Sequence, residues 1–202
     1  MTNIKLCGLR RPDDIRYANM LLPEYVGFVF AKKSSRYVSA EEAALLRKQL
    51  DQGIIPVGVF VDEEPKAIAD LLSRDIIAVA QLHGQESEKD ILKLQEKTGC
   101  PVIKAFCIGS SEDIEAANES PADFVLLDSG KGSGKTFDWE LLKGMKRPYF
   151  LAGGLTPENV RDVVDRWQPF GVDASSSLET DGYKDPAKMA AFVNAVRNGK
   201  DA

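Results

Sequence analysis

Short apolar runs alternate with amphipathic segments along the entire sequence, and this regularity leaves few folds open to the chain. The runs are rich in Val, Ile and Phe, as buried strands are, and each is followed by a segment with helical periodicity. Eight runs are predicted to be strands: Asn3–Cys7, Tyr25–Phe30, Ile55–Val61, Ile76–His83, Pro101–Cys107, Phe124–Asp128, Tyr149–Gly153 and Phe170–Ser175.

The segments that follow the strands are predicted to be helices. Ser39, Asp138 and Thr156 each precede an acidic first turn, as helix N-caps do. The predicted helices are Asp13–Leu22, Ala40–Gln52, Pro65–Ser73, Glu86–Thr98, Ser111–Asn118, Trp139–Lys143, Pro157–Arg166 and Pro186–Asn198.

Eight strand–helix units in 202 residues amount to about 25 residues each, close to the minimum for a closed (β/α)8 TIM barrel. No linker or change of composition interrupts the pattern, so residues 1–202 are predicted to form a single barrel domain. The alternative is an open doubly wound sheet of six strands, with Asn3–Cys7 and Phe170–Ser175 lying elsewhere. In a closed barrel the functional residues are expected where the strands end, because the eight C-terminal ends surround one mouth.

The charge balance argues against a nucleic-acid partner. The sequence has 26 Lys and Arg against 31 Asp and Glu, a net charge of −5, and neither sign forms a block. There is no apolar run long enough to cross a membrane and no secretory signal at the N-terminus. We therefore expect a soluble, cytoplasmic protein with no membrane partner.

The cysteine and histidine counts restrict the chemistry further. Cys7, Cys100 and Cys107 lack the paired spacing of zinc sites, and His83 is the one histidine. A multi-histidine metal site is therefore excluded, and we expect neither a bound metal nor a disulfide framework. Acid–base chemistry in such a chain depends on carboxylates or thiols.

The first strand ends in a thiol with a cation near it. Period-two alternation places Lys5 and Cys7 on one face, and the apolar Ile4 and Leu6 on the other, so the first pair is expected to point into the barrel. A cation below the thiol favours the thiolate and predicts a pKa for Cys7 lowered from about 8.5 towards neutrality. The alternative is that Cys7 is a small buried apolar residue, as we expect of Cys100 and Cys107.

The sixth strand ends in a carboxylate. Asp128 follows four apolar residues, so partial desolvation would favour its protonated form and a role as general acid. The alternative is a structural carboxylate that caps loop amides. Asp62 and Asp173 also end strands, and alternation alone does not rank the three.

The glycine-rich loop at 129–136 ends in Gly134-Lys135-Thr136, as a Walker A phosphate loop does. Ser129 occupies the position of the required first glycine, and the 66 residues after the loop are too few for a nucleotidase sheet. We interpret the loop as a cover over the barrel mouth.

Better candidates for phosphate binding follow the last two strands, where barrels commonly hold phosphate. Gly153 and Gly154 let backbone N–H groups approach an anion, and Ser175, Ser176 and Ser177 offer further donors. A simple tight turn is the alternative for the two glycines.

Arg36 lies in the loop after the second strand, and its planar guanidinium suits a carboxylate. The alternative is a solvated loop charge, as we expect of Lys32 and Lys33. His83, at the end of the fourth strand, is expected to be a hydrogen-bonded residue of the mouth rather than a catalytic one.

Together these strand ends resemble those of the phosphoribosylanthranilate isomerases of tryptophan biosynthesis. The resemblance runs in order from residue 5 to about 180 and is specific as a set. Its segments are Lys5-Leu6-Cys7-Gly8-Leu9, Gly27-Phe28-Val29-Phe30, Ser34-Ser35-Arg36, Gln81-Leu82-His83-Gly84, Leu127-Asp128, Phe137-Asp138-Trp139, Leu151-Ala152-Gly153-Gly154-Leu155, and Asp173-Ala174-Ser175-Ser176 with Glu179.

The resemblance implies a cofactor-free Amadori rearrangement of a small-molecule phosphosugar substrate. Asp128 would protonate the furanose ring oxygen, Cys7 would remove the C2′ proton, and Arg36 would hold the anthranilate carboxylate. Gly154, Ser175 and Ser176 would help to hold the phosphate. Ser177 replaces the glycine usual in the family, which leaves the phosphate geometry open, and the sequence leaves open whether the protein is a monomer or a homodimer.

There are three alternative hypotheses for the function. A metal-dependent epimerase would need a ligand cluster that one histidine does not supply, and an indole-forming synthase would need catalytic lysine and glutamate. A non-catalytic phosphosugar-binding barrel would keep Arg36, Gly154 and Ser175 but would not need Cys7 or Asp128.

Overall fold

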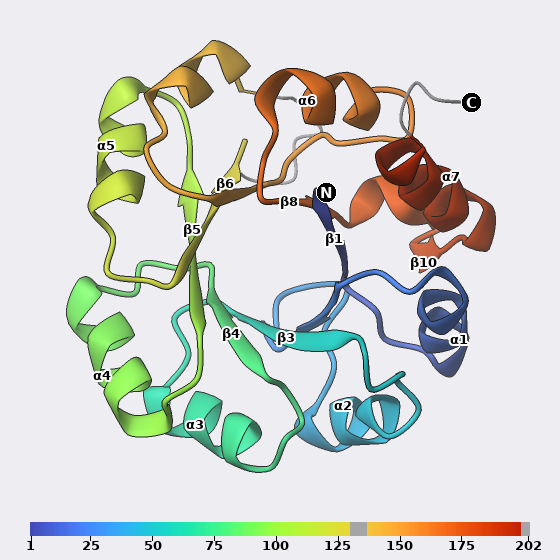
Figure 1. Ribbon diagram of the computed structural model, residues 1–202. Coiled ribbons are helices and arrows are strands. Elements are labelled where there is room, and N and C mark those ends of the chain that lie inside the picture. The colour runs from blue at the N-terminus through green and yellow to red at the C-terminus, as the bar shows by residue number, and fades with distance from the viewer. Residues whose placement is uncertain (130–136, 199–202) are drawn as a thin grey trace.

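Eight parallel strands close into a barrel with the helices outside it, as Figure 1 shows. The computed structural model describes residues 1–129 and 137–198. β1 pairs with both β2 and β8, which excludes the open six-stranded sheet and confirms the predicted (β/α)8 barrel. The strands are β1 (Asn3–Cys7), β2 (Tyr25–Val29), β3 (Ile55–Phe60), β4 (Val79–Leu82), β5 (Val102–Cys107), β6 (Phe124–Asp128), β7 (Tyr149–Leu151) and β8 (Gly171–Ala174).

The helices follow the strands as predicted, with differences at several ends. Among the described residues, none is long and apolar enough to cross a membrane. Ser39 is the N-cap of α2 and forms a reciprocal capping box with Glu42. The Ser39 hydroxyl accepts from the Glu42 N–H, and the Glu42 carboxylate accepts from the Ser39 N–H. The helices are α1 (Pro12–Leu21), α2 (Ala40–Arg47), α3 (Pro65–Ser73), α4 (Glu88–Thr98), α5 (Ser111–Glu119), the 3-10 helix η1 (Trp139–Gly144), α6 (Val160–Trp167) and α7 (Pro186–Arg197).

Two of the differences have a visible local cause. The prediction for the second helix is too long, because the chain turns after Arg47 while the buried Leu50 continues the apolar pattern. The prediction for the helix after β7 starts too early. The Asn159 side chain accepts from the Thr156 N–H and donates to the Gly154 carbonyl, so residues 157–159 form a turn and α6 begins at Val160.

Between β8 and α7 lie elements that the sequence analysis did not predict. A short 3-10 turn, η2 (Ser176–Leu178), leads into an antiparallel hairpin of β9 (Glu179–Thr180) and β10 (Tyr183–Lys184). Its turn is Asp181-Gly182, and both residues have positive φ, of 52° and 76°. An Asp-Gly pair is the usual signal for such a turn. The strands of two residues are too short to show the alternation that identifies strands.

One end of the barrel is closed by aromatic side chains. Phe124, Phe150 and Phe170 pack with Tyr25 near the N-terminal ends of the strands, with ring centroids 5.1 to 6.0 Å apart. Val57, Val79, Ile103 and Leu126 belong to the same interior cluster. The barrel also buries Lys5, Gln81 and Asp173. The open mouth therefore lies at the C-terminal ends of the strands, as in other barrels of this kind.

Candidate active site

Cys7 ends β1 on the inner face of the barrel, above a buried ion pair. Its residue is 7% exposed, and Lys5, two positions earlier on the same strand, is fully buried. The Lys5 ammonium lies 3.0 Å from the Asp173 carboxylate, which the β1–β8 register places directly opposite. The structure thus confirms the predicted position of the cation and adds a partner, Asp173, that the sequence analysis had placed only at a strand end.

The predicted lowering of the Cys7 pKa is wrong. Burial raises the pKa of the thiol, and the lowering effects of Lys5 and Lys184 do not overcome it. Asp173 also raises the pKa of Cys7, and it neutralises part of the Lys5 field because it lies in contact with the ammonium. The resting group is therefore a thiol. The expectation that Cys107 is a buried apolar residue is also wrong, because Cys107 is exposed, and Cys100 is only partly buried.

Asp128 ends β6 and faces His83 at the mouth. Its side chain is 21% exposed, and one carboxylate oxygen lies 3.4 Å from His83 Nε2. Gln81, which is buried, donates an amide N–H to His83 Nδ1 over 3.1 Å. A neutral His83 therefore carries its proton on Nε2, towards Asp128. The expectation of a hydrogen-bonded histidine at the mouth is confirmed. Gln81 also belongs to the site, although the sequence alone indicates no role for it.

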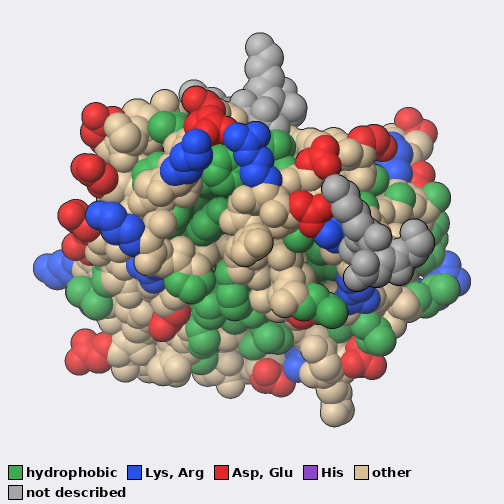
Figure 2. Space-filling model, turned by 45° about the horizontal axis from the view of Figure 1, so that its top comes forward, with side chains coloured by type: hydrophobic (Ala, Val, Ile, Leu, Met, Phe, Trp, Pro, Cys, Tyr) green, Lys and Arg blue, Asp and Glu red, His purple; other side chains and the backbone are tan. Residues whose placement is uncertain are grey.

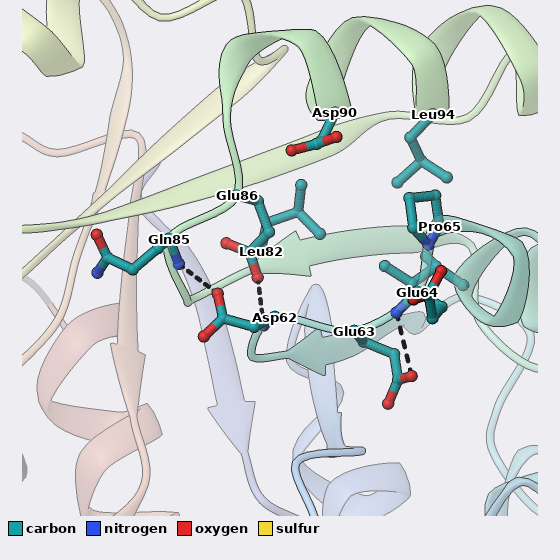
Figure 3. A pocket seen from close by; sticks show the side chains of 10 residues that line it. Asp62, Glu63, Glu64, Pro65, Leu82, Gln85, Glu86, Asp90 and Leu94 are labelled. Carbon is teal, nitrogen blue, oxygen red and sulfur yellow. Dashed lines mark hydrogen bonds between the residues drawn. The ribbon is translucent and has the colours of Figure 1, made fainter.

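The surroundings of Asp128 differ from those of Asp62 and Asp173, the other two aspartates at strand ends. Asp173 is buried against Lys5. Asp62 turns to the loop after β4, where its carboxylate accepts from the Gln85 N–H over 2.6 Å, as Figure 3 shows. That loop borders a separate cavity of about 230 Å³ between α3 and α4. Asp62 is thus a carboxylate that caps a loop amide.

Arg36 reaches the mouth beside Cys7 but is held by a carboxylate of its own chain. Its Nε and Nη2 donate to the two carboxylate oxygens of Glu179, each over 2.7 Å. Its aliphatic part lies over Gly8, where a Cβ atom would come within 2.5 Å of Arg36 Cδ. Lys32 and Lys33 are exposed, as expected of solvated charges.

The loops after β7 and β8 form the candidate phosphate site. Gly153 and Gly154 have positive φ, of 83° and 69°, a conformation that favours glycine. Backbone N–H groups in a turn of this kind can bind an anion. The Ser175 hydroxyl donates to the Cys7 carbonyl over 3.0 Å, so this loop is tied to β1. Ser176 is exposed, and Ser177 lies in η2, outside the positive-φ positions that would favour the glycine usual there.

The remaining part of the glycine-rich loop, residues 130–136, lies outside the described residues, as does the predicted cover over the mouth. Charged side chains of both signs are scattered over the face seen in Figure 2.

A family model described as N-(5′-phosphoribosyl)anthranilate (PRA) isomerase matches residues 4–195. The chain belongs to this family. Among curated members, the isomerase of Acetivibrio thermocellus is 40% identical over 98% of this chain and 96% of its own length. The isomerase of Thermoanaerobacter sp. is 43% identical over 98% of both chains.

A crystal structure of phosphoribosyl anthranilate isomerase has a TM-score of 0.87 and 36% identity, over 98% of this chain and 99% of that one. It contains reduced 1-(o-carboxyphenylamino)-1-deoxyribulose 5-phosphate. The resemblance drawn from the strand ends is thereby confirmed, and the chain is an isomerase of tryptophan biosynthesis.

Proposed function

We propose that this isomerase rearranges N-(5′-phosphoribosyl)anthranilate at the barrel mouth, with Asp128 as the acid and Cys7 as the base. The observation that carries the proposal is the position of these two groups, a carboxylate and a thiol that end inward-facing positions of β6 and β1. An aldose–ketose rearrangement of this kind needs one proton donor and one acceptor. Both are available without a histidine that acts as acid or base.

In the first step Asp128 donates its proton to the furanose ring oxygen. The bond between that oxygen and C1′ breaks, and the nitrogen lone pair forms the iminium ion. His83 Nε2, 3.4 Å from a carboxylate oxygen of Asp128, would stabilise the anion that Asp128 becomes.

In the second step Cys7 acts in its thiolate form, which is the minor form because the resting group is a thiol, and takes the proton from C2′. The electron pair of the C–H bond forms the enolamine, which tautomerises to the ketone of the product. Because burial raises the pKa of Cys7, the thiolate depends on the cations near it, Lys5 and Lys184, whose charges lower that pKa.

Substrate binding is proposed to use the two ends of the mouth. The Arg36 edge formed by Nη1 and Nη2 would meet the anthranilate carboxylate, since the Nε edge is taken by Glu179. Backbone N–H groups at Gly154, Ser175 and Ser176 would hold the phosphate, for which the turn after β7 and the β8 loop are suited.

We further propose that the enzyme works in the cytoplasm, without a metal or organic cofactor, as a monomer or a homodimer. A solved relative from Thermotoga maritima is described as a monomer generated from a dimeric enzyme. Sedimentation of the purified protein over a range of concentrations would distinguish the two states.

The proposed reaction is tested with freshly made N-(5′-phosphoribosyl)anthranilate and purified protein, with EDTA present. We expect the anthranilate fluorescence to fall with multiple turnovers per protein molecule. Absence of any fall in wild-type protein that is folded would contradict the proposed reaction, and a fall that EDTA abolishes would contradict the metal-free mechanism.

A further inference from the structure

We propose that Glu179 and Lys184, which face each other across the β9–β10 hairpin, are positioning residues that direct Arg36 towards the carboxylate of the substrate. This inference rests on the proposed role of Arg36.

The contact between Glu179 and Arg36 fixes the direction of the guanidinium. Both hydrogen bonds are 2.7 Å long and engage Nε and Nη2, the edge that lies along the side chain. A planar guanidinium held by two hydrogen bonds on that edge is restricted in its rotation about its last bonds. The terminal edge, Nη1 with the second Nη2 proton, is then presented in one direction.

Lys184 fixes the carboxylate in turn. Its ammonium donates to Glu179 Oε1 over 2.7 Å and to the Ser175 carbonyl over 2.9 Å, and its side chain is 1% exposed. Ser175 itself donates to the Cys7 carbonyl. The buried lysine therefore joins the carboxylate that holds Arg36 to the loop after β8 and, through it, to the end of β1.

The hairpin is anchored from its other side as well. The guanidinium groups of Arg10 and Arg11 both lie over the Tyr183 ring, 4.8 and 4.5 Å from its centroid. Arg10 also donates to the carbonyls of Ser35 and Gly182, over 2.9 and 2.8 Å. Because Ser35 directly precedes Arg36, these contacts hold the hairpin and the Arg36 loop as one unit.

The charges of the cluster suit this role. Burial raises the pKa of Glu179, but the hydrogen bonds from Arg36 and Lys184 outweigh it and leave the pKa lowered, so the group is a carboxylate at neutral pH. Two cations flank this one anion. One positive charge therefore remains for an anionic group of the substrate, in a setting that is mostly removed from water.

The test compares Glu179→Gln and Lys184→Met with Thr180→Ala, a control in the same hairpin whose exposed side chain contacts Asp185. Two ligands are titrated into each variant. One is reduced 1-(o-carboxyphenylamino)-1-deoxyribulose 5-phosphate, and the other is the same compound without the carboxyl group. Thermal melting is recorded alongside, because Lys184→Met removes a buried charge.

We expect Glu179→Gln to weaken binding of the carboxylated ligand by about 10-fold, which is the size of one lost charge-assisted contact, and to leave the carboxyl-free ligand nearly unchanged. The KM should rise more than kcat falls. Lys184→Met should show the same selectivity, and Thr180→Ala should show none.

Equal weakening of both ligands by Glu179→Gln and Lys184→Met, or no weakening of either, would overturn the inference, because the cluster would then serve only the hairpin. Arg36→Lys separates this failure from failure of the proposed function. If Arg36→Lys also fails to distinguish the two ligands, Arg36 does not bind the carboxylate and the proposed function is wrong at that residue. If it distinguishes them by about 10- to 150-fold while Glu179→Gln does not, the positioning role alone is wrong.

Discussion

Cys7 is subject to two opposing influences, the burial of its thiol and the cation two residues earlier on the same strand. The sequence shows the cation, because alternation places Lys5 on the same face. It does not show that Asp173, 168 residues further along, pairs with that cation. The size of an electrostatic effect depends on burial and on partners from distant strands, so the position of the thiol could be predicted while the direction of its pKa shift could not.

The raised pKa predicts the order in which the cysteines react. At neutral pH iodoacetamide should modify the exposed Cys107 faster than Cys7, and the Cys7 rate should continue to rise above the ordinary thiol pKa of about 8.5. Peptide mass spectrometry over a time course measures both rates. Faster labelling of Cys7 at neutral pH would mean that its thiolate is already formed.

Asp128 gives a second prediction at this scale. Asp128→Asn keeps the shape of the side chain but removes the transferable proton, so kcat should fall by about 10² to 10⁴ while KM changes little. Steady-state kinetics at several pH values measure both constants. Wild-type activity in this variant would move the acid role to Asp173, because Asp62 is engaged by the loop after β4.

At the scale of elements, strand ends were easier to predict than the loops that follow them. The strands repeat a pattern of alternation long enough to recognise, and their ends place Cys7 and Asp128. The hairpin consists of two-residue strands, so its only sequence signal is the Asp181-Gly182 turn. Glu179 belongs to the segments that carry the family resemblance, but its contact with Arg36 joins loops 143 residues apart in the sequence.

The loop after β1 gives a prediction with a matched control. Gly8→Ala places a Cβ 2.5 Å from Arg36 Cδ at a φ of 80°, so it should destabilise the protein by about 1 kcal/mol or more and also raise KM by displacing Arg36. Gly99→Ala has a similar strain, at a φ of 65°, with nothing near its Cβ. It should lower the melting temperature without affecting KM. A KM change of equal size in both variants would contradict the contact with Arg36.

At the scale of the whole molecule, one end of the barrel contributes to stability and the other end carries the functional residues. The aromatic cluster closes the N-terminal end, while the polar groups lie at the mouth. The closed barrel could be predicted because eight similar units leave few alternatives, and barrel geometry then places every strand end around one site.

We therefore expect substitutions in the aromatic cluster to lower the stability of the protein without lowering its activity. Phe150→Ala removes a fully buried ring that contacts Tyr25, Phe124 and Phe170, and should lower the free energy of unfolding by about 3 to 5 kcal/mol. Denaturant unfolding measures the loss. The kcat of the protein that remains folded should be close to that of the wild type, and a large fall in kcat would show that the closed end also shapes the mouth.

The division of proton transfers between a carboxylate and a thiol is tested most directly by Cys7→Ser in single-turnover experiments. Serine has nearly the volume of cysteine but is a far weaker acid, so it does not supply an anionic base near neutral pH. With enzyme in excess over freshly made N-(5′-phosphoribosyl)anthranilate, the rate of fluorescence loss should fall by about 10² to 10⁴ while the melting temperature stays near that of the wild type. A rate close to that of the wild type would contradict the assignment of Cys7 as the base.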